Sequence, residues 1–224
     1  MRLEQDPIHH HKDVLAHTIA VTVKTQPERL VRLAALLHDV GKPKTRSIGD
    51  HGVSFHHHEV VGARMARDRM QALKYSNDDV EAVRLLVYLH LRFHGYGDGW
   101  TDAAVRRFVR DAGEQFERLV DLTASDCTTR NKRKAAELAR RMDEFKVRVV
   151  ELREQEELDS IRPDLDGRQV MDHLGLGPGR HVGKALEHLL ELRLDEGPLG
   201  EEEAYRRLDA WWAEQAPAPD RTEG

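Results

Sequence analysis

The stretch 33-LAALLHDVGKPKT-45 decides the fold, because it ends a strongly apolar segment on two polar residues. The apolar residues around it recur with the 3.6-residue period of a buried helix face, at Leu30, Leu33, Ala34, Leu36 and Leu37. Gly41 and Pro43 stop the pattern, so His38 and Asp39 are expected in the last turn of the helix. A buried carboxylate without a partner is costly, and a bound cation is therefore a good explanation for this pair.

Histidines stand at informative places on both sides of this helix. Residues 14–23, VLAHTIAVTV, predict a helix that carries His17. Residues 44–57 contain glycines and no helical period, so we expect a loop that returns over the helix end and delivers His56, His57 and His58 nearby, with the next helix starting close to His58. A lone histidine on an apolar face is usually a hydrogen-bonded core residue, but here several occur together.

Two later helices add further candidates. Residues 76–79, SNDD, supply caps for a helix on which His90 and His94 share one face with Val83 and Val87. A second helix is expected to bring Asp126 onto the same face as three upstream residues, Phe116, Leu119 and Thr123.

Composition bounds the class of protein. Of the 224 residues, 39% are hydrophobic and 33% charged, which suits one main domain with a highly charged, helix-rich exterior. No apolar run suits a membrane span or a signal peptide, so we expect a cytoplasmic protein that uses no membrane. Cys127 is the only cysteine, and any metal ligands must therefore be histidines and carboxylates.

The chain is expected to divide into a metal-binding domain over residues 1–130, a basic helix and helical tail over 131–215, and a disordered end over 216–224. The second part begins with a basic run, since residues 130–148 hold eight Lys or Arg against three acids. After residue 163 the composition changes, and the last thirty residues carry nine acids against three bases.

The order His17, His38-Asp39, Asp126, each on an expected helix, resembles the HD superfamily of metal-dependent phosphohydrolases. The segment LAALLHDVGKPKT, with Gly41 and Lys42 directly after the pair, is similar to the signature of that family. The resemblance covers residues 10–130 and implies an all-α fold, an HD-domain helical bundle with a C-terminal helical tail. It also implies that the four residues ligate one ion.

Some HD proteins hold a second ion, and His58 and His90 stand at the matching places. Asp39 would then bridge the two ions, with His94 as an alternative to His90. The alternative is a single ion, with these histidines bonded to substrate phosphate. Histidine and carboxylate suit Mn, Fe, Co, Ni or Zn equally. Asp39 and Lys42 are the catalytic candidates, although Lys42 could also be a solvated lysine at a helix end.

The segments HLRFHGYGDGWTDAAVRRFVRDAG and ASDCTTRNKRKAAE and the C-terminal tail are similar to the C-terminal part of bacterial CCA tRNA nucleotidyltransferases. This resemblance covers nearly all of residues 7–212 and makes tRNA a possible partner. The nucleotidyltransferase head of those enzymes, with its Asp-x-Asp metal motif in a Gly-rich context, has no counterpart in this sequence. We therefore expect that this chain alone does not polymerise CCA and that a separate head is a possible partner.

Positive charge marks the expected contact with nucleic acid. Arg130, Lys132, Arg133 and Lys134 lie in the basic run and are candidates for backbone phosphate. A solvated helix face is the commoner explanation for such a run.

Two functions follow from these patterns. The first is a metal-dependent phosphohydrolase or phosphodiesterase acting on a nucleotide, a cyclic phosphate or an RNA-end phosphoester. The alternative is a non-catalytic, tRNA-binding body of a CCA tRNA nucleotidyltransferase with a structural metal.

Overall fold

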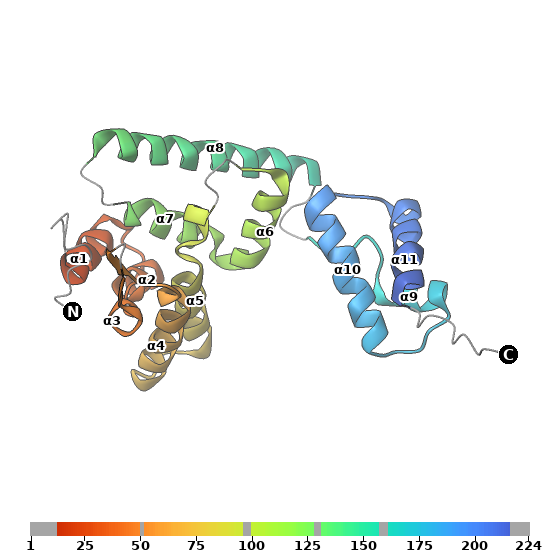
Figure 1. Cartoon of the computed structure of the whole chain (residues 1–224), viewed down its shortest axis with the longest axis horizontal. Coiled ribbons are helices and arrows are strands. Elements are labelled where there is room, and N and C mark those ends of the chain that lie inside the picture. Colours follow the sequence, from red (N-terminus) through yellow and green to blue (C-terminus); the bar gives the residue numbers. More distant parts are fainter. Residues whose placement is uncertain (1–12, 50–51, 96–99, 128–130, 157–160, 216–224) are drawn as a thin grey trace. The chain divides into compact units, whose positions relative to one another are not determined.

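The computed structural model describes residues 13–49, 52–95, 100–127, 131–156 and 161–215, and these are almost entirely helical (Figure 1). The expected all-α class is confirmed. In chain order the helices are α1 Val14–Lys24, α2 Arg29–Leu37, α3 Lys42–Thr45, α4 His58–Ala72, α5 Asn77–Leu89, η1 Arg92–Gly95, α6 Asp102–Ala112, η2 Gly113–Gln115, α7 Phe116–Asp126, α8 Lys132–Glu156, α9 Gly167–Leu174, α10 Arg180–Glu196 and α11 Glu201–Gln215.

The chain divides into two compact units. The first consists of residues 1–99 and 111–147, and the second of residues 100–110 and 148–224. The sequence division after residue 130 stays a prediction about the domains. The expected disordered end, 216–224, lies outside the described residues. Across the described ranges, no helix combines the length and apolar character needed to cross a membrane.

The core of the first unit forms where α2 packs against α1, α5 and α7, and α4 packs against α5. The Ser76 hydroxyl caps α5 by accepting the Asp79 N–H at 3.2 Å, as the SNDD segment predicts. Across α2 and α5, the Arg29 guanidinium donates two 2.8 Å bonds to the Asp79 carboxylate. Fully buried apolar side chains fill the space between these helices, among them Val14, Val21, Val31, Ala34, Ala66, Val83, Leu86, Val87 and Leu122.

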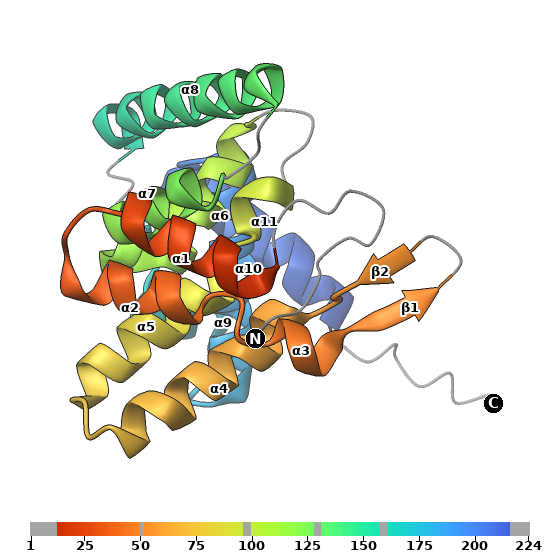
Figure 2. The ribbon, with the colours of Figure 1, turned by 90° about the vertical axis from the view of Figure 1, so that its left-hand side faces the viewer.

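The expected loop over residues 44–57 is wrong in part. The short helix α3 and an antiparallel hairpin of β1, Ser47–Gly49, and β2, Gly52–Ser54, occupy most of it (Figure 2). Ile48 pairs with Val53 across the hairpin, and Ile48 is 71% exposed. Strands this short bury little apolar surface, so they leave no periodic pattern in the sequence. The hairpin still does what the loop was expected to do, since it returns the chain to the start of α4.

Gly41, at the start of α3, lets the chain that follows α2 approach α4 backbone to backbone. A Cβ atom at this position would overlap the carbonyl oxygen of His58 and would lie 2.8 Å from the backbone nitrogen of Gly62. Neither atom belongs to a flexible side chain, so only a shift of a whole helix could relieve the overlap. This close approach brings the His38-Asp39 pair next to His58.

Gly41→Ala is expected to lower the free energy of unfolding by about 3 kcal/mol or more, because overpacking against backbone forces the helices apart. Denaturant titration followed by circular dichroism measures this loss. Gly183→Ala is the matched control, since a Cβ there meets nothing within 4 Å. The free energy of unfolding of the Gly183→Ala control is expected to rise by up to about 1 kcal/mol, because alanine favours the interior of a helix. Equal effects of the two substitutions would contradict the role given to Gly41.

The second unit has a small core of its own, built from α9, α10 and α11. Asp166 begins α9 with a capping box, in which its side chain accepts the Gln169 N–H and the Gln169 side chain accepts the Asp166 N–H. Gly175 ends the helix in the left-handed conformation with φ of 66°. The buried core residues are Leu165, Val170, Val182, Ala185, Leu189, Ala204 and Leu208.

Candidate metal centre

His17 and Asp126 meet although more than one hundred residues separate them. His17 lies in the middle of α1 on its buried face, and Asp126 is the last residue of α7. The two helices pack so that His17 Nε2 lies 2.9 Å from Asp126 Oδ1. The structure therefore brings the first and last members of the expected ligand set into direct contact.

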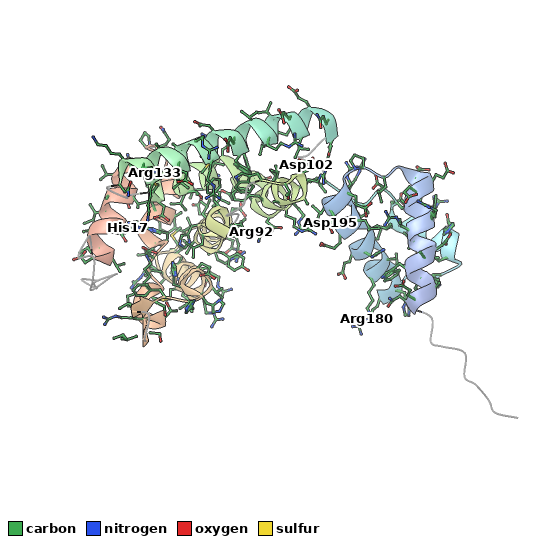
Figure 3. The ribbon with its side chains drawn as sticks, turned by 45° about the horizontal axis from the view of Figure 1, so that its top comes forward. His17, Arg92, Asp102, Arg133, Arg180 and Asp195 are labelled. Carbon is green, nitrogen blue, oxygen red and sulfur yellow. The ribbon has the colours of Figure 1, made fainter. Side chains whose placement is uncertain are left out.

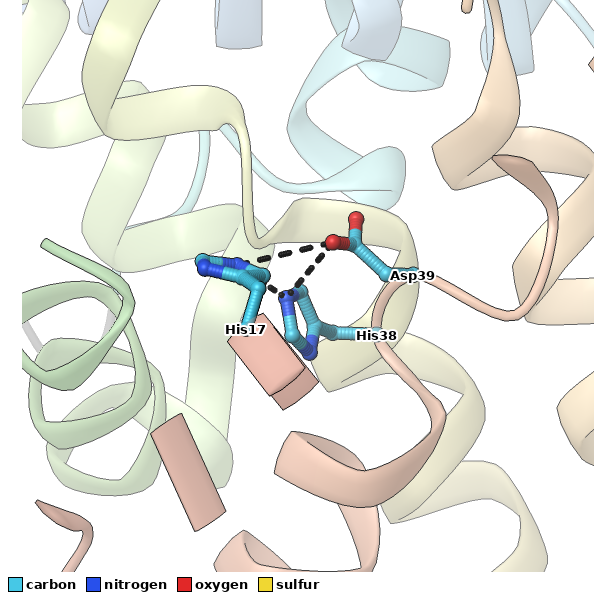
Figure 4. A group of neighbouring side chains, drawn as sticks. All are labelled: His17, His38 and Asp39. Atoms are coloured by element: carbon cyan, nitrogen blue, oxygen red, sulfur yellow. Dashed lines mark hydrogen bonds and ion pairs between the residues drawn. The ribbon is translucent and has the colours of Figure 1, made fainter. Parts of the chain in front are cut away.

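His38 and Asp39 follow the last residue of α2 and complete this group (Figure 4). His38 Nε2 lies 3.2 Å from His17 Nε2 and 3.3 Å from Asp39 Oδ2. Asp39 Oδ2 is also 3.5 Å from His17 Nε2. Both residues of the pair are 1% exposed, so their polar atoms face one another and not solvent.

His58 and His90 form a second group on the other side of Asp39. His58 is the first residue of α4 and His90 follows the last residue of α5. The single helix expected to carry both His90 and His94 is wrong, because α5 ends at Leu89 and His94 falls in η1. His58 Nε2 lies 3.3 Å from Asp39 Oδ1, the carboxylate oxygen that does not face His17. The His90 ring lies 5.3 Å, centre to centre, from the rings of both His38 and His58.

Three of these rings are held by the same backbone contact. The Nδ1 atom of His38 lies 2.7 Å from the Ala35 carbonyl oxygen. In the same way, His58 Nδ1 lies 2.8 Å from the Phe55 carbonyl oxygen, and His90 Nδ1 lies 2.6 Å from the Val87 carbonyl oxygen. A carbonyl oxygen only accepts, so each Nδ1 must carry the hydrogen. In the neutral ring, Nε2 is then left with a lone pair that can bind a metal, the arrangement usual for metal-ligating histidines.

The donor set fits one or two divalent ions. His17, His38 and Asp39 can offer ligand atoms within 4.8 Å of one another, and so can Asp39, His58 and His90. The Nε2 atoms of His58 and His90 are buried and have no hydrogen-bond partner. Leaving buried polar atoms unpaired is unfavourable, and a cation between them would satisfy both. Imidazole and carboxylate ligands suit a transition metal but do not select one.

Charge in the cluster is arranged to favour a cation. Burial raises the pKa of both carboxyl groups, but the adjacent imidazoles outweigh it, lowering the pKa of Asp126 to about 2 and that of Asp39 well below its usual range. For His38, burial lowers the pKa, but Asp39 and Asp126 outweigh it and the net pKa is raised. The cluster thus attracts a proton to His38, which a bound ion would displace.

His90 behaves in the opposite way, and this gives a pH prediction. Burial, helped by the charge of His38, lowers the pKa of His90 from 6.5 to about 4. As the pH falls, the unfolded chain therefore binds a proton at His90 before the folded protein does. Protonation of His90 favours unfolding between the pKa of the unfolded chain, 6.5, and that of the fold, about 4. The His90 contribution costs the metal-free fold about 2 kcal/mol at about pH 5, relative to neutral pH.

His90→Gln is expected to remove this pH-dependent loss. Urea unfolding of chelator-treated protein near pH 7 and near pH 5 measures it, and the drop in stability should be smaller in the variant than in the wild type by about 2 kcal/mol. An identical drop in the two proteins would show that His90 titrates normally in the fold.

Lys42 lies next to the cluster. Its Nζ is 2.8 Å from Asp39 Oδ2, and its side chain is 12% exposed. The Phe55 ring lies 5.7 Å from the ammonium. The solvated-lysine interpretation does not describe this contact, since the ammonium is paired with a buried carboxylate.

The remaining candidates fall elsewhere. His56 and His57 are exposed, although both precede His58, and the side chain of His94 lies outside the described residues. The other cationic candidates, Lys132, Arg133 and Lys134, are exposed in the first turn of α8, where Figure 3 labels Arg133. Arg130 lies outside the described residues.

Sequence reasoning missed Lys24 of α1. Its ammonium donates to backbone carbonyls at the end of α7, which carries Asp126. The available signal was its spacing, because Lys24 follows His17 by seven residues, or two helical turns.

Comparison with known proteins agrees with the geometry. The HD domain family matches residues 10–203 of the chain. An A-adding tRNA nucleotidyltransferase of Deinococcus radiodurans is 34% identical over 215 residues, covering 93% of this chain and 48% of the relative. A CC-adding tRNA nucleotidyltransferase of Thermus thermophilus is 34% identical over 214 residues, covering 91% and 46%. The chain thus spans about half the length of these relatives.

Proposed function

The chain belongs to the HD domain family, and from that premise we propose that it is a metal-dependent phosphohydrolase acting on a nucleotide, a cyclic phosphate or an RNA-end phosphoester. The observation that carries the proposal is the position of Asp39. One carboxylate oxygen lies 3.3 Å from His38 Nε2, and the other lies 3.3 Å from His58 Nε2. A single side chain therefore belongs to both candidate groups and could bridge two ions.

The ligands we propose are His17, His38, Asp39 and Asp126 for one ion, and Asp39, His58 and His90 for a second. A divalent ion held there would supply Lewis-acid activation of water and of a phosphoryl oxygen. Five of these six residues lie at helix ends, and four of the five, His38, Asp39, His58 and His90, are buried there, which would hold their donor atoms in fixed positions. The protein itself would contribute this orientation and the exclusion of bulk water.

Lys42 is proposed as the residue that holds the substrate phosphate. Its ammonium contacts Asp39 Oδ2 at 2.8 Å, and its side chain is the more exposed member of that pair. A phosphate oxygen entering from solvent could therefore be met by the ammonium, which would offset its negative charge. Asp39 would keep the ammonium at that position.

Elemental analysis of the purified protein tests the proposal first, and hydrolysis assays follow with Mn, Fe, Co, Ni or Zn added. The substrates are nucleotides, 2′,3′-cyclic phosphates and RNA with a terminal phosphate. The double variant His38→Ala with Asp39→Ala should lose both metal and turnover, while the exposed neighbour His56→Ala should keep both. A double variant that retains both metal and turnover would rule out this centre.

A second function has support of its own, a tRNA-binding body with a structural metal. The two relatives are tRNA nucleotidyltransferases, so a head of that kind, on the same or another chain, is a possible partner. Lys132, Arg133 and Lys134 stand in the first turn of α8, where the helix dipole disfavours positive charge. Binding of tRNA phosphates would offset that local repulsion.

Replacing Lys132, Arg133 and Lys134 with glutamine is expected to weaken tRNA binding and to flatten its salt dependence. The slope of log K against log salt should fall by up to about 3 if all three contact phosphate. Filter binding at several salt concentrations measures the slope. The control replaces three exposed arginines of α4, Arg64, Arg67 and Arg69. An equal change in both triple variants would indicate only a general effect of net charge.

A further inference from the structure

Lys24, the last residue of α1, reaches the end of α7. Its Nζ donates to the Ala124 carbonyl at 2.6 Å and to the Cys127 carbonyl at 3.1 Å. These two carbonyls flank Asp126, which is the last helical residue. One ammonium therefore hydrogen-bonds to the backbone on both sides of a candidate metal ligand.

The contact uses the same side of α1 that carries His17. Seven residues separate His17 and Lys24, which is two turns, so both face α7. A second contact supports the first, since the backbone N–H of Gln26 donates to Asp121 Oδ2 at 2.9 Å. The end of α1 and the turn after it thus hold the last two turns of α7.

The end of a helix needs such support. Its last carbonyls have no partner within the helix, and its final turn frays most readily. A lysine ammonium satisfies these carbonyls and also interacts favourably with the negative end of the helix dipole. Without Lys24, Asp126 would sit on the least constrained residue of α7.

We infer that Lys24 is a positioning residue for the ion held by His17, His38, Asp39 and Asp126, an inference that rests on the proposed function. It fixes Asp126 Oδ1 at 2.9 Å from His17 Nε2 by holding the two helices together at that end. The second group, Asp39, His58 and His90, takes no ligand from α1 or α7. The effect of Lys24 is therefore selective for one of the two ions.

Titration of the full chain with Co²⁺, followed by calorimetry and by visible absorption, tests this inference. Asp126→Ala should abolish binding of one ion. Lys24→Met should lower the affinity for that same ion by about 10-fold or more, the usual effect of removing a group that orients a ligand. The absorption band of that ion should change shape as its coordination loosens. Lys24→Arg should largely restore binding, because its guanidinium can donate to the same carbonyls. Lys146→Met, an exposed lysine on α8, is the control.

The outcomes separate the two levels of the proposal. If the wild type takes up no Co²⁺, the proposed function fails and this inference fails with it. If Asp126→Ala loses an ion but Lys24→Met binds Co²⁺ as the wild type does, only the role of Lys24 is overturned. The same holds if Lys24→Met lowers the melting temperature without changing the affinity of either ion, because Lys24 would then be merely structural.

Discussion

Replacing Asp39 with asparagine is expected to strip the protein of divalent metal at both candidate groups. Asp39 is the one side chain common to them, and its two oxygens face His38 and His58 separately. Asparagine keeps the shape but removes the negative charge and places an amide N–H₂ where one oxygen stood. Because outer-sphere changes alone weaken metal binding 10–100-fold, loss of the shared ligand should weaken it by at least about 100-fold.

Elemental analysis after dialysis, followed by calorimetric titration with Mn²⁺ or Zn²⁺, measures this loss. His58→Ala is the informative comparison, since it removes a ligand from one group only and should leave one ion bound. His56→Ala, an exposed histidine two residues away, should keep the metal content of the wild type. Circular dichroism establishes that the helices of each variant are folded.

Two results would contradict the role given to Asp39. Wild-type metal content in Asp39→Asn would show that neither group depends on this carboxylate. Loss of a single ion, with the other unchanged in affinity, would show that the carboxylate serves one group and does not bridge.

The helices were predictable because each one leaves a local signal. The α2 stripe, the SNDD cap of α5 and the long charged run of α8 all correspond to described helices. Gly41 and Pro43 placed the end of α2 to within two residues, but the expected location of His38 and Asp39 in its last turn is wrong, because α2 ends at Leu37 and both residues follow it. These signals involve neighbours within a few residues, so they can be read without knowing how the helices pack.

The convergence of the cluster was expected from resemblance to a family and not from physics alone. Nothing local to Asp126 indicates that α7 will pack against α1, and the 2.9 Å contact with His17 spans more than one hundred residues. The contact of Lys24 with α7 could not be predicted for the same reason, because its partners are backbone carbonyls, which every residue possesses. The hairpin after α3 was missed because its strands are too short to show alternation.

Arg106 shows the same limit inside the second unit, because its partners lie 50 to 89 residues away along the chain. It lies on the charged helix α6, yet it is 4% exposed. Its Nε and Nη2 donate to the Glu156 carboxylate at 2.7 and 2.8 Å. Its Nη1 donates to the Leu194 and Asp195 carbonyls, both at 3.2 Å. One guanidinium therefore joins α6, the end of α8 and the last turn of α10.

Arg106→Met is expected to lower the free energy of unfolding by about 3 kcal/mol, since it leaves the largely buried Glu156 carboxylate without its partner. Two backbone carbonyls would lose their donor at the same time. Arg107→Met is the matched control on the same helix, because Arg107 is more exposed and bonds Glu191 and Asp195 at the surface. That substitution should cost about 1 kcal/mol or less.

A double variant separates the two causes of the loss. Adding Glu156→Leu to Arg106→Met removes the unpaired carboxylate and replaces the ion pair with apolar contact, which should recover part of the stability. Arg106→Lys keeps the charge but cannot form the paired contact to Glu156 and reach the carbonyls as well, so it should fall between the wild type and Arg106→Met. Urea unfolding of the wild type, the three single variants and the double variant gives the order of their stabilities directly. If Arg106→Met cost no more than Arg107→Met, the buried guanidinium would not be what holds these three helices together.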